Sequence, residues 1–219
     1  MHNKKMILLV PALLLAAATA IAQDDEAPER YTYATYLKCD TSNESLADDY
    51  VKKTEAPVMD KLVEDGKLLS WGWLKHHTGG EWRRIRYFQA DSINGALAGL
   101  GTMGEALEKA GAGDDVGIGV SCKSHDDYIW QVKAGMSGTD RGKAGLSVYF
   151  TCKMTEEDRA DEIVATDFAP IYDKLVEEGK ITSWGWQSHV IGGWFRRLLT
   201  MTATDYDALM DARGEALAA

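Results

Sequence analysis

The chain has few of the residues that metal centres and hydrolytic sites need. It has three cysteines without a Cys-x-x-Cys pair, and its histidines beyond residue 22 are His76, His77, His125 and His189. A zinc site needs three or four converging ligands, whereas His76 and His77 point to opposite faces of a predicted strand. The Gly-x-Ser-x-Gly elbow of many serine hydrolases is absent. The sequence therefore predicts no metal site and no serine nucleophile.

Basic residues are scarce relative to acidic ones. The chain has 24 Lys and Arg against 34 Asp and Glu, so its formal net charge is −10. The charge becomes −12 if the N-terminal segment with Lys4 and Lys5 is removed. Since contacts with nucleic-acid phosphates need clustered Lys and Arg, we expect neither nucleic acid nor an anionic membrane surface as a partner.

Long apolar stretches are missing beyond the N-terminus, where residues 1–22 have the pattern of a secretory signal peptide. Lys4 and Lys5 precede the apolar stretch Met6–Ala20, and Ala20-Ile21-Ala22 is a small-x-small cleavage site. The alternative is a membrane anchor, but the apolar stretch is shorter than the span of about 20 residues that a bilayer requires. The sequence therefore predicts an exported protein, periplasmic or extracellular, without membrane contact after cleavage.

What the chain does have is an internal repeat. Residues 36–96 align with residues 149–209 at a constant offset of 113, without a gap. The stretch APVMDKLVEDGKLLSWGW at 56–73 returns as APIYDKLVEEGKITSWGW at 169–186. His76, Gly79, Gly80, Arg83 and Arg84 return as His189, Gly192, Gly193, Arg196 and Arg197. Two copies are too few for a solenoid, so the repeat predicts two domains packed about a pseudo-twofold axis.

Each copy predicts the same order of elements. A strand rich in aromatic and β-branched residues comes first, and a helix follows in which Pro57 or Pro170 introduces a kink or a new start. A Gly-Gly hairpin and a second helix come next. In the first copy the elements are 31–39, 47–67, 68–78 with 81–90, a helix after Asp91, and a fourth strand at 120–132; the second copy has no clear final strand. We predict an α+β fold with ferredoxin-like units at 23–135 and 146–219, joined by a Gly-rich linker at 136–145.

This element order, the proline-containing first helix and the tandem repeat resemble the dimeric α/β-barrel superfamily, in which two ferredoxin-like units put their sheets together. The resemblance covers most of the chain after residue 22 and implies an intramolecular version of that barrel. Its members include cofactor-free quinone-forming monooxygenases, small-ring isomerases, haem-degrading enzymes, chlorite-dismutase-like haem proteins and stress-response proteins. The motif Ser-Trp-Gly-Trp…His…Gly-Gly…Arg-Arg matches no catalytic signature of these members, so the resemblance implies a fold and leaves the activity open.

The Gly-Gly turns assign side chains to the two faces of each hairpin. A two-residue loop pairs His76 with Arg83 and His189 with Arg196 across the strands. Alternation puts Gly72, these residues and Tyr87 on one face, whereas Trp71, Trp73 and Phe88 lie on the other. Because the second face is the more apolar, we expect it to contact helices or the opposing sheet.

The repeated His–Arg pairs are the predicted ligand site. An imidazole beside a guanidinium can anchor a carboxylate or phenolate, so the expected partner is a small anionic or aromatic molecule. The alternative is that the pairs are solvated rim contacts and the tryptophans fill a core. The predicted ligand-binding residues are His76, Arg83, Tyr87, His189, Arg196, Trp73 and Trp186.

Three functions stay open at this point. The first is an exported protein that binds a small molecule. The second is a cofactor-independent monooxygenase or isomerase acting on aromatic compounds, with His76 or His189 as general base and Arg83 or Arg196 as oxyanion partner. The third is a non-catalytic structural or interaction protein of the cell envelope. No cofactor is predicted, although a haem needs only one axial histidine and stays open, as does further homodimerisation.

The ferredoxin-like arrangement also implies a disulfide. Export permits one, and three cysteines allow one bridge with one thiol left over. In such a sheet the first strand lies antiparallel beside the fourth, so the end of the first strand approaches the start of the fourth. The resemblance therefore implies a Cys39–Cys122 bridge and a free Cys152.

Overall fold

The computed structural model describes residues 29–78, 80–112 and 117–219. The predicted signal segment 1–22 lies outside these residues. Within them, no helix is both long enough and apolar enough to cross a bilayer.

The first unit contains the elements of a ferredoxin-like fold in the predicted order. Its first helix is broken into α1, a π-helical turn at Val51–Glu55, and α2. Pro57 lies in the first turn of α2, and Glu55 and Ala56 before it keep right-handed helical dihedrals. The chain therefore stays helical through the π-helical turn that precedes the proline. The elements are β1 (Tyr31–Cys39), α1 (Glu44–Tyr50), α2 (Ala56–Glu64), β2 (Ser70–Lys75), β3 (Arg84–Ala90), α3 (Ile93–Lys109), α4 (Ile118–Ser121) and β4 (Cys122–Ser137).

The second unit follows with the same elements up to its last helix. A π-helical turn at Val164–Phe168 again precedes a helix that starts at an Ala-Pro pair. In the described part of the chain, no strand follows that unit's final helix. The elements are β5 (Ala144–Phe150), α5 (Glu157–Ile163), α6 (Ala169–Glu177), β6 (Ser183–Gly192), β7 (Arg197–Ala203) and α7 (Tyr206–Ala218).

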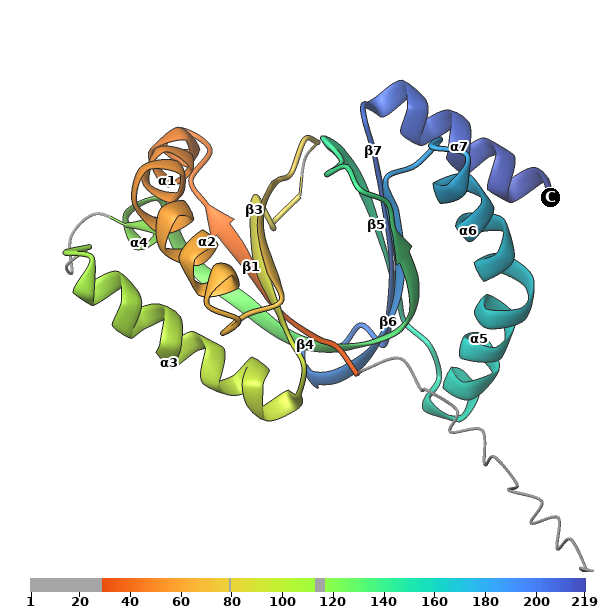
Figure 1. Cartoon of the computed structure of the whole chain (residues 1–219), viewed down its shortest axis with the longest axis horizontal. Helices are drawn as coiled ribbons and strands as arrows, with labels where there is room; N and C mark the ends of the chain where they lie inside the picture. The colour runs from red at the N-terminus through yellow and green to blue at the C-terminus, as the bar shows by residue number, and fades with distance from the viewer. Residues whose placement is uncertain (1–28, 79, 113–116) are drawn as a thin grey trace, which may run out of the picture.

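The described strands form one seven-stranded sheet in the order β2-β3-β1-β4-β6-β7-β5. All neighbours are antiparallel, and β4 joins the units because it pairs with β1 on one side and β6 on the other. The sheet curls so that β3 faces β5 and β7 across the interior, and the helices cover its outer surface (Figure 1). The predicted α+β class with two ferredoxin-like units is confirmed.

Strands extend into the predicted linker at 136–145 from both of its ends. Strand β4 continues through Ser137 and β5 already begins at Ala144. The last residues of β4 pair with β6, with Ala134 opposite Trp186 and Ser137 opposite Ser183. This pairing gives their backbone groups hydrogen-bond partners. Gly135 has φ +153°, and a Cβ there would lie 2.6 Å from the carbonyl oxygen of Trp184. This glycine therefore marks a close approach of two strands.

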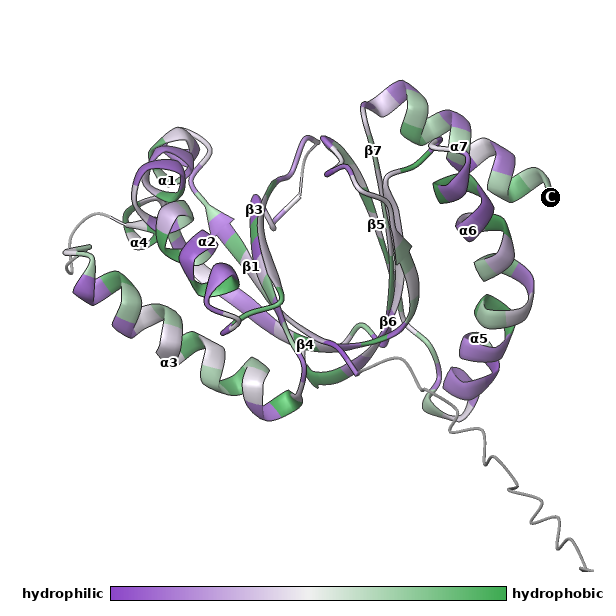
Figure 2. Ribbon diagram, viewed as in Figure 1, coloured by the Kyte–Doolittle hydropathy of each residue, from purple (hydrophilic) through white to green (hydrophobic). Residues whose placement is uncertain are grey.

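Strand β1 is buried on both faces because helices cover one side and the curled sheet encloses the other. Tyr33 packs with Met59 and Phe88 on the helix side, whereas Tyr36 lies on the inner side. The inner side is filled largely by aromatic rings. The helices carry mixed apolar and hydrophilic residues (Figure 2). The inner cluster comprises Ala34, Tyr36, Tyr128, Trp130 and Leu198, with Trp82, Ile85, Tyr87, Tyr149 and Phe195 packed against it.

A disulfide ties the end of β1 to the start of β4. Cys39 and Cys122 are paired positions of the two strands and are bonded to each other, whereas Cys152 is free. This is the pair that the ferredoxin-like arrangement implied. The bridge closes a segment with a sequence separation of 83 residues.

Replacing both bonded cysteines is expected to destabilise the protein strongly. In the chain-entropy account, opening a loop of this size removes about 4 kcal/mol of stability. Urea unfolding of Cys39→Ala/Cys122→Ala against wild type measures the loss, and Cys152→Ala is the matched control with a far smaller change. A double variant as stable as the control would contradict the bridge.

Candidate ligand-binding site

The predicted His–Arg pairs lie where the hairpin register put them. The backbone N–H of His76 donates to the carbonyl of Arg83 at 3.0 Å, and that of His189 donates to Arg196 at 3.0 Å. Arg196 Nη1 also donates to His189 Nδ1 at 2.8 Å. In the first pair the side chains turn to other partners, since His76 Nδ1 donates to the carbonyl of Trp82 at 2.6 Å.

Both arginines of these pairs already have carboxylate partners. Arg83 Nε lies 2.6 Å from Glu44 Oε1, and Arg196 binds Glu157 in the same way. The Arg83 guanidinium also donates to the carbonyl of Thr78. An anionic ligand would have to displace these carboxylates, so the geometry favours a structural role for the pairs.

The adjacent arginine of the motif anchors the first helix of its unit to the sheet. Arg84 Nε binds Asp48 at 2.8 Å and its Nη1 binds Glu44 at 3.0 Å. Trp73 Nε1 donates to the same Asp48 at 2.8 Å. In the second unit, Arg197 and Trp186 make the equivalent contacts with Glu157 and Asp161. The two predicted ligand-binding tryptophans therefore face the helices.

Tyr87 occupies the space beside Gly72 on the inner face. A Cβ at Gly72 would lie 2.4 Å from the Tyr87 ring, so the glycine admits a ring of the protein itself. In the second unit the residue opposite Gly185 is Thr200. The predicted room for a ligand at Gly72 is thus filled by Tyr87.

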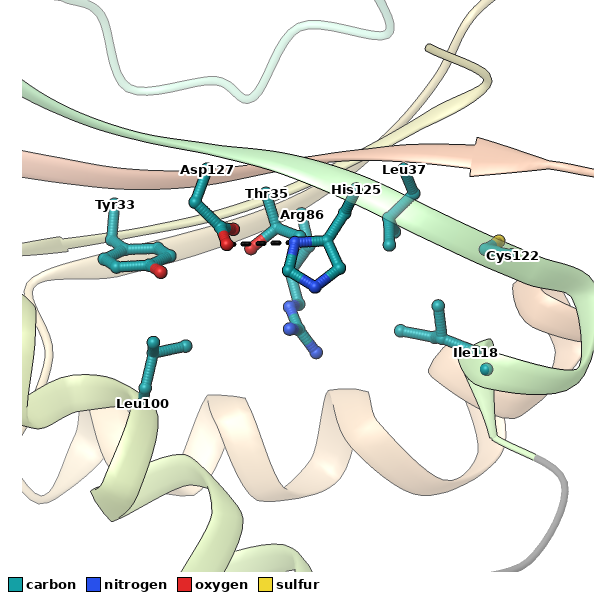
Figure 3. Close-up of a pocket in the computed structure, with 10 residues that line it drawn as sticks. Tyr33, Thr35, Leu37, Arg86, Leu100, Ile118, Cys122, His125 and Asp127 are labelled. Carbon is teal, nitrogen blue, oxygen red and sulfur yellow. Dashed lines mark ion pairs between the residues drawn. The ribbon is translucent and has the colours of Figure 1, made fainter. Parts of the chain in front are cut away.

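A pocket of about 350 Å³ lies elsewhere, between the outer face of the first unit's sheet and the helices (Figure 3). None of the seven predicted ligand-binding residues lines it. Its lining residues are Tyr33, Thr35, Leu37, Arg86, Leu100, Ile118, Gly119, Cys122, His125 and Asp127.

Strand register brings the polar residues of this pocket together. Thr35 of β1 is paired with Arg86 of β3 on one side and with Asp127 of β4 on the other. His125 lies two residues before Asp127, so both side chains project from the same face, and His125 Nδ1 lies 2.9 Å from Asp127 Oδ2. The imidazole and the guanidinium both point into the pocket (Figure 3).

The buried carboxyl group of Glu55 is an ion-pair partner of Arg86. Glu55, the last residue of the first π-helical turn, is 1% exposed, and its carboxylate oxygens lie 3.4 and 3.5 Å from Arg86 Nη1. Burial raises the pKa of Glu55, and Arg86 opposes that rise. Burial also raises the pKa of the Tyr33 hydroxyl, and the negative charge of Asp127 adds to the effect.

The remaining wall of the pocket is apolar. Leu37 comes from β1, Leu100 from α3 and Ile118 from α4. Leu37 lies beside His125 on the sheet, whereas Leu100 and Ile118 face the charged groups from the helix side (Figure 3). Small-molecule sites combine an apolar lining with a few polar groups in this way.

The second unit replaces the charged pair of this pocket with apolar side chains. At the repeat offset, Phe168 stands for Glu55 and Leu199 stands for Arg86. Leu146 stands in the same way for Tyr33, and all three replacements pack against the core of the second unit. His125 and Asp127 have no counterpart among the described residues, because no strand follows α7. The pocket therefore belongs to the first unit.

The sequence reasoning missed Glu55, Arg86, His125 and Asp127 as site residues. That reasoning considered mainly residues that are the same in both copies, whereas these four residues lie at positions where the copies differ. A position-by-position comparison would have found the pairs Glu55/Phe168 and Arg86/Leu199. The i, i+2 spacing of His125 and Asp127 on a strand was the second available signal.

A dinucleotide site does not fit the residues present. Residues 99–104 read Gly-Leu-Gly-Thr-Met-Gly, but they lie within α3 and not at a strand-to-helix turn, so they do not form a dinucleotide site. A haem in this pocket would need His125 as axial ligand.

The comparisons with known proteins agree with this architecture. No protein-family model and no curated protein matches the sequence. Among solved structures, a candidate monooxygenase from Lactobacillus acidophilus NCFM has a TM-score of 0.61 at 8% identity, covering 84% of this chain and 81% of that one. The chain has the dimeric α/β-barrel fold.

Two more barrel proteins extend the comparison. A candidate monooxygenase from Fusobacterium nucleatum subsp. nucleatum has a TM-score of 0.50 at 16% identity, covering 85% of this chain and 80% of that one. A candidate chlorite dismutase has a TM-score of 0.51 at 8% identity, covering 86% of this chain and 85% of that one. At such identities the likeness concerns the barrel and carries no residue roles.

The Asp48 anchor is expected to make stability depend on pH. Burial acts to raise the pKa of Asp48, but hydrogen bonds from Arg84, Lys75 and Trp73 outweigh it and hold the pKa at about 2. Since the unfolded value is about 3.9, the group contributes about 2 kcal/mol above pH 4, and this is lost as the pH falls towards 2.

Urea unfolding of Asp48→Asn at pH 7 and pH 2 measures that contribution. The variant is expected to lose about 2 kcal/mol relative to wild type at pH 7 and almost nothing at pH 2. Asp49→Asn is the control, because this exposed neighbour pairs with Lys53 on its own helical stretch and exposed pairs contribute little. An equal loss at both pH values would contradict the assignment.

Exchanging the buried charge pair for its second-unit counterparts tests whether the fold needs it. The double variant Glu55→Phe/Arg86→Leu is expected to be at least as stable as wild type, since apolar replacement of a buried pair is often neutral or stabilising. Arg86→Leu alone is expected to lose about 3 kcal/mol at pH 8, because Glu55 stays buried without its partner. A double variant less stable than the single one would show that the pair serves the fold.

Proposed function

We propose that the chain binds a small aromatic anion in the pocket of the first unit. The observation that carries this proposal is the division of one cavity between charged and apolar walls. Arg86, His125 and Asp127 project from the sheet beside Leu37, and Leu100 and Ile118 lie on the helix side of a cavity of about 350 Å³ (Figure 3). A cavity of this size suits a molecule of one or two rings with a polar end.

Each wall has a role in this binding. The Arg86 guanidinium offers paired N–H donors to a carboxylate or phenolate. His125 has Nδ1 engaged by Asp127, so Nε2 is left to meet the ligand. The apolar wall accepts the ring by excluding it from water.

We also propose that binding takes place outside the cytoplasm. The sequence pattern of residues 1–22 supports export. The Cys39–Cys122 bridge supports it as well, because disulfides persist in oxidising compartments. A periplasmic or extracellular location would give the pocket access to ligands from the surroundings.

A second candidate function is proton abstraction from a phenolic substrate followed by reaction with O₂. His125 would be the general base, oriented by Asp127, and Arg86 would stabilise the developing oxyanion. O₂ would take the electrons, one oxygen atom entering the product as a carbonyl while the other leaves as water. The 2.9 Å His125–Asp127 contact favours this candidate, as do the two candidate monooxygenases among the structural neighbours.

Calorimetric titration with 2-naphthoate tests the proposed site against the one predicted from the sequence. We expect one ligand per chain and a tenfold or greater loss of affinity in Arg86→Leu, since a charged hydrogen bond contributes about 1.5–3 kcal/mol. The esterified probe, methyl 2-naphthoate, is expected to bind more weakly.

Matched histidine variants locate the site. His125→Gln is expected to weaken 2-naphthoate binding, whereas His76→Gln and His189→Gln keep wild-type affinity. If His76→Gln or His189→Gln weakened binding and His125→Gln did not, the ligand would lie on the hairpin face instead. Absence of 2-naphthoate, benzoate and salicylate binding in wild type would refute an aromatic-anion site.

A further inference from the structure

Glu55 is an unusual neighbour for an anion-binding pocket. Its side chain is 1% exposed, and in the described part of the chain its ion-pair partner is Arg86. The contacts of 3.4 and 3.5 Å are loose for an ion pair. A loosely held arginine is free to share its donors with a second anion.

The groups around the Glu55 carboxyl supply too little positive charge to balance another anion. Arg86 faces it from β3 and Tyr50 from α1, and the pocket beyond holds Tyr33 on β1 with His125 and Asp127 on β4. A bound carboxylate would leave one guanidinium between two anions. An uncompensated buried charge is costly, and such groups usually neutralise by changing protonation state.

We propose that binding of an anionic ligand at Arg86 is coupled to uptake of one proton by Glu55. This inference rests on the proposed function, since it concerns the same pocket. The ligand and the proton enter together, so the net charge of the pocket is unchanged. A ligand with one negative charge fits this exchange, whereas a dianion leaves one charge uncompensated.

The second unit supports a role for Glu55 outside folding. There Phe168 and Leu199 replace both members of the pair, and the same helix and strands form around them. The charged pair is therefore not required to build this part of a unit. Its presence in the first unit coincides with the pocket.

The coupling has a defined pH dependence. Burial already holds the pKa of Glu55 above its usual value in the free protein, and a bound anion raises it further. Affinity is highest below the free pKa, falls about tenfold per pH unit between the free and bound pKa values, and levels off above them. His125 also meets the ligand in the proposed site, so variants must separate its contribution from that of Glu55.

Calorimetry with 2-naphthoate separates them. Titrations between about pH 6 and 9, in phosphate and in Tris, count the protons exchanged because the two buffers differ in ionisation enthalpy. Wild type is expected to take up about one proton per ligand within the sensitive window. His125→Gln is expected to bind more weakly, with Glu55 still taking up one proton.

Glu55→Gln is the decisive variant, because its amide mimics the protonated carboxyl in size and charge. It is expected to bind 2-naphthoate without proton uptake at this position, and its affinity no longer falls tenfold per pH unit. Wild type is expected to bind naphthalene-2,6-dicarboxylate more weakly than 2-naphthoate. Infrared difference spectra of wild type provide a second readout, a new carboxylic-acid C=O band on binding that does not depend on a variant folding.

The outcomes distinguish this inference from the proposed function. Binding by wild type with no proton exchange at any pH overturns the coupling and leaves the ligand site standing. Unchanged proton uptake in Glu55→Gln assigns the proton to another group and also overturns it. No binding of 2-naphthoate, benzoate or salicylate by wild type refutes the proposed function itself.

Discussion

The two halves of the molecule depend on one strand, β4. Its first part pairs with β1 and its last part with β6, so the described strands make one continuous sheet. The same strand places His125 and Asp127 on the helix side and Tyr128 and Trp130 on the inner side. Because side chains alternate along a strand, β4 supplies both a polar wall of the pocket and part of the aromatic interior.

The shared motif and the pocket have different physical roles. In both units, the motif arginine and tryptophan converge on carboxylates of the first helix, as with Arg84 and Asp48. The motif is therefore present in both copies because each unit uses it to hold its first helix on the sheet. The copies diverge beside the candidate pocket, at Glu55 and Arg86, and the second copy keeps its fold with Phe168 and Leu199 in place of this buried charge pair.

Much of the fold could be predicted from the sequence because its signals are local. Counting outwards from the Gly-Gly pairs predicted the hairpin register, although Gly192 itself pairs with Tyr128 of β4. The two prolines marked the starts of α2 and α6. The length of β4 could not be predicted from its own residues, since Gly135 and its neighbours become strand only by pairing with β6. The site was missed for a related reason: Arg86, Thr35 and Asp127 are far apart in sequence and meet only through the register of three strands.

The shared strand also determines how the chain divides into pieces. The segment between β4 and β5 is short, and residues 138–141 are exposed. A cut there would leave β4 with the first fragment and an unpaired β6 edge on the second. Such edges associate by strand addition, so the two fragments should reassemble without a covalent link. The protein is thus a natural candidate for fragment complementation, with the cut placed away from the pocket.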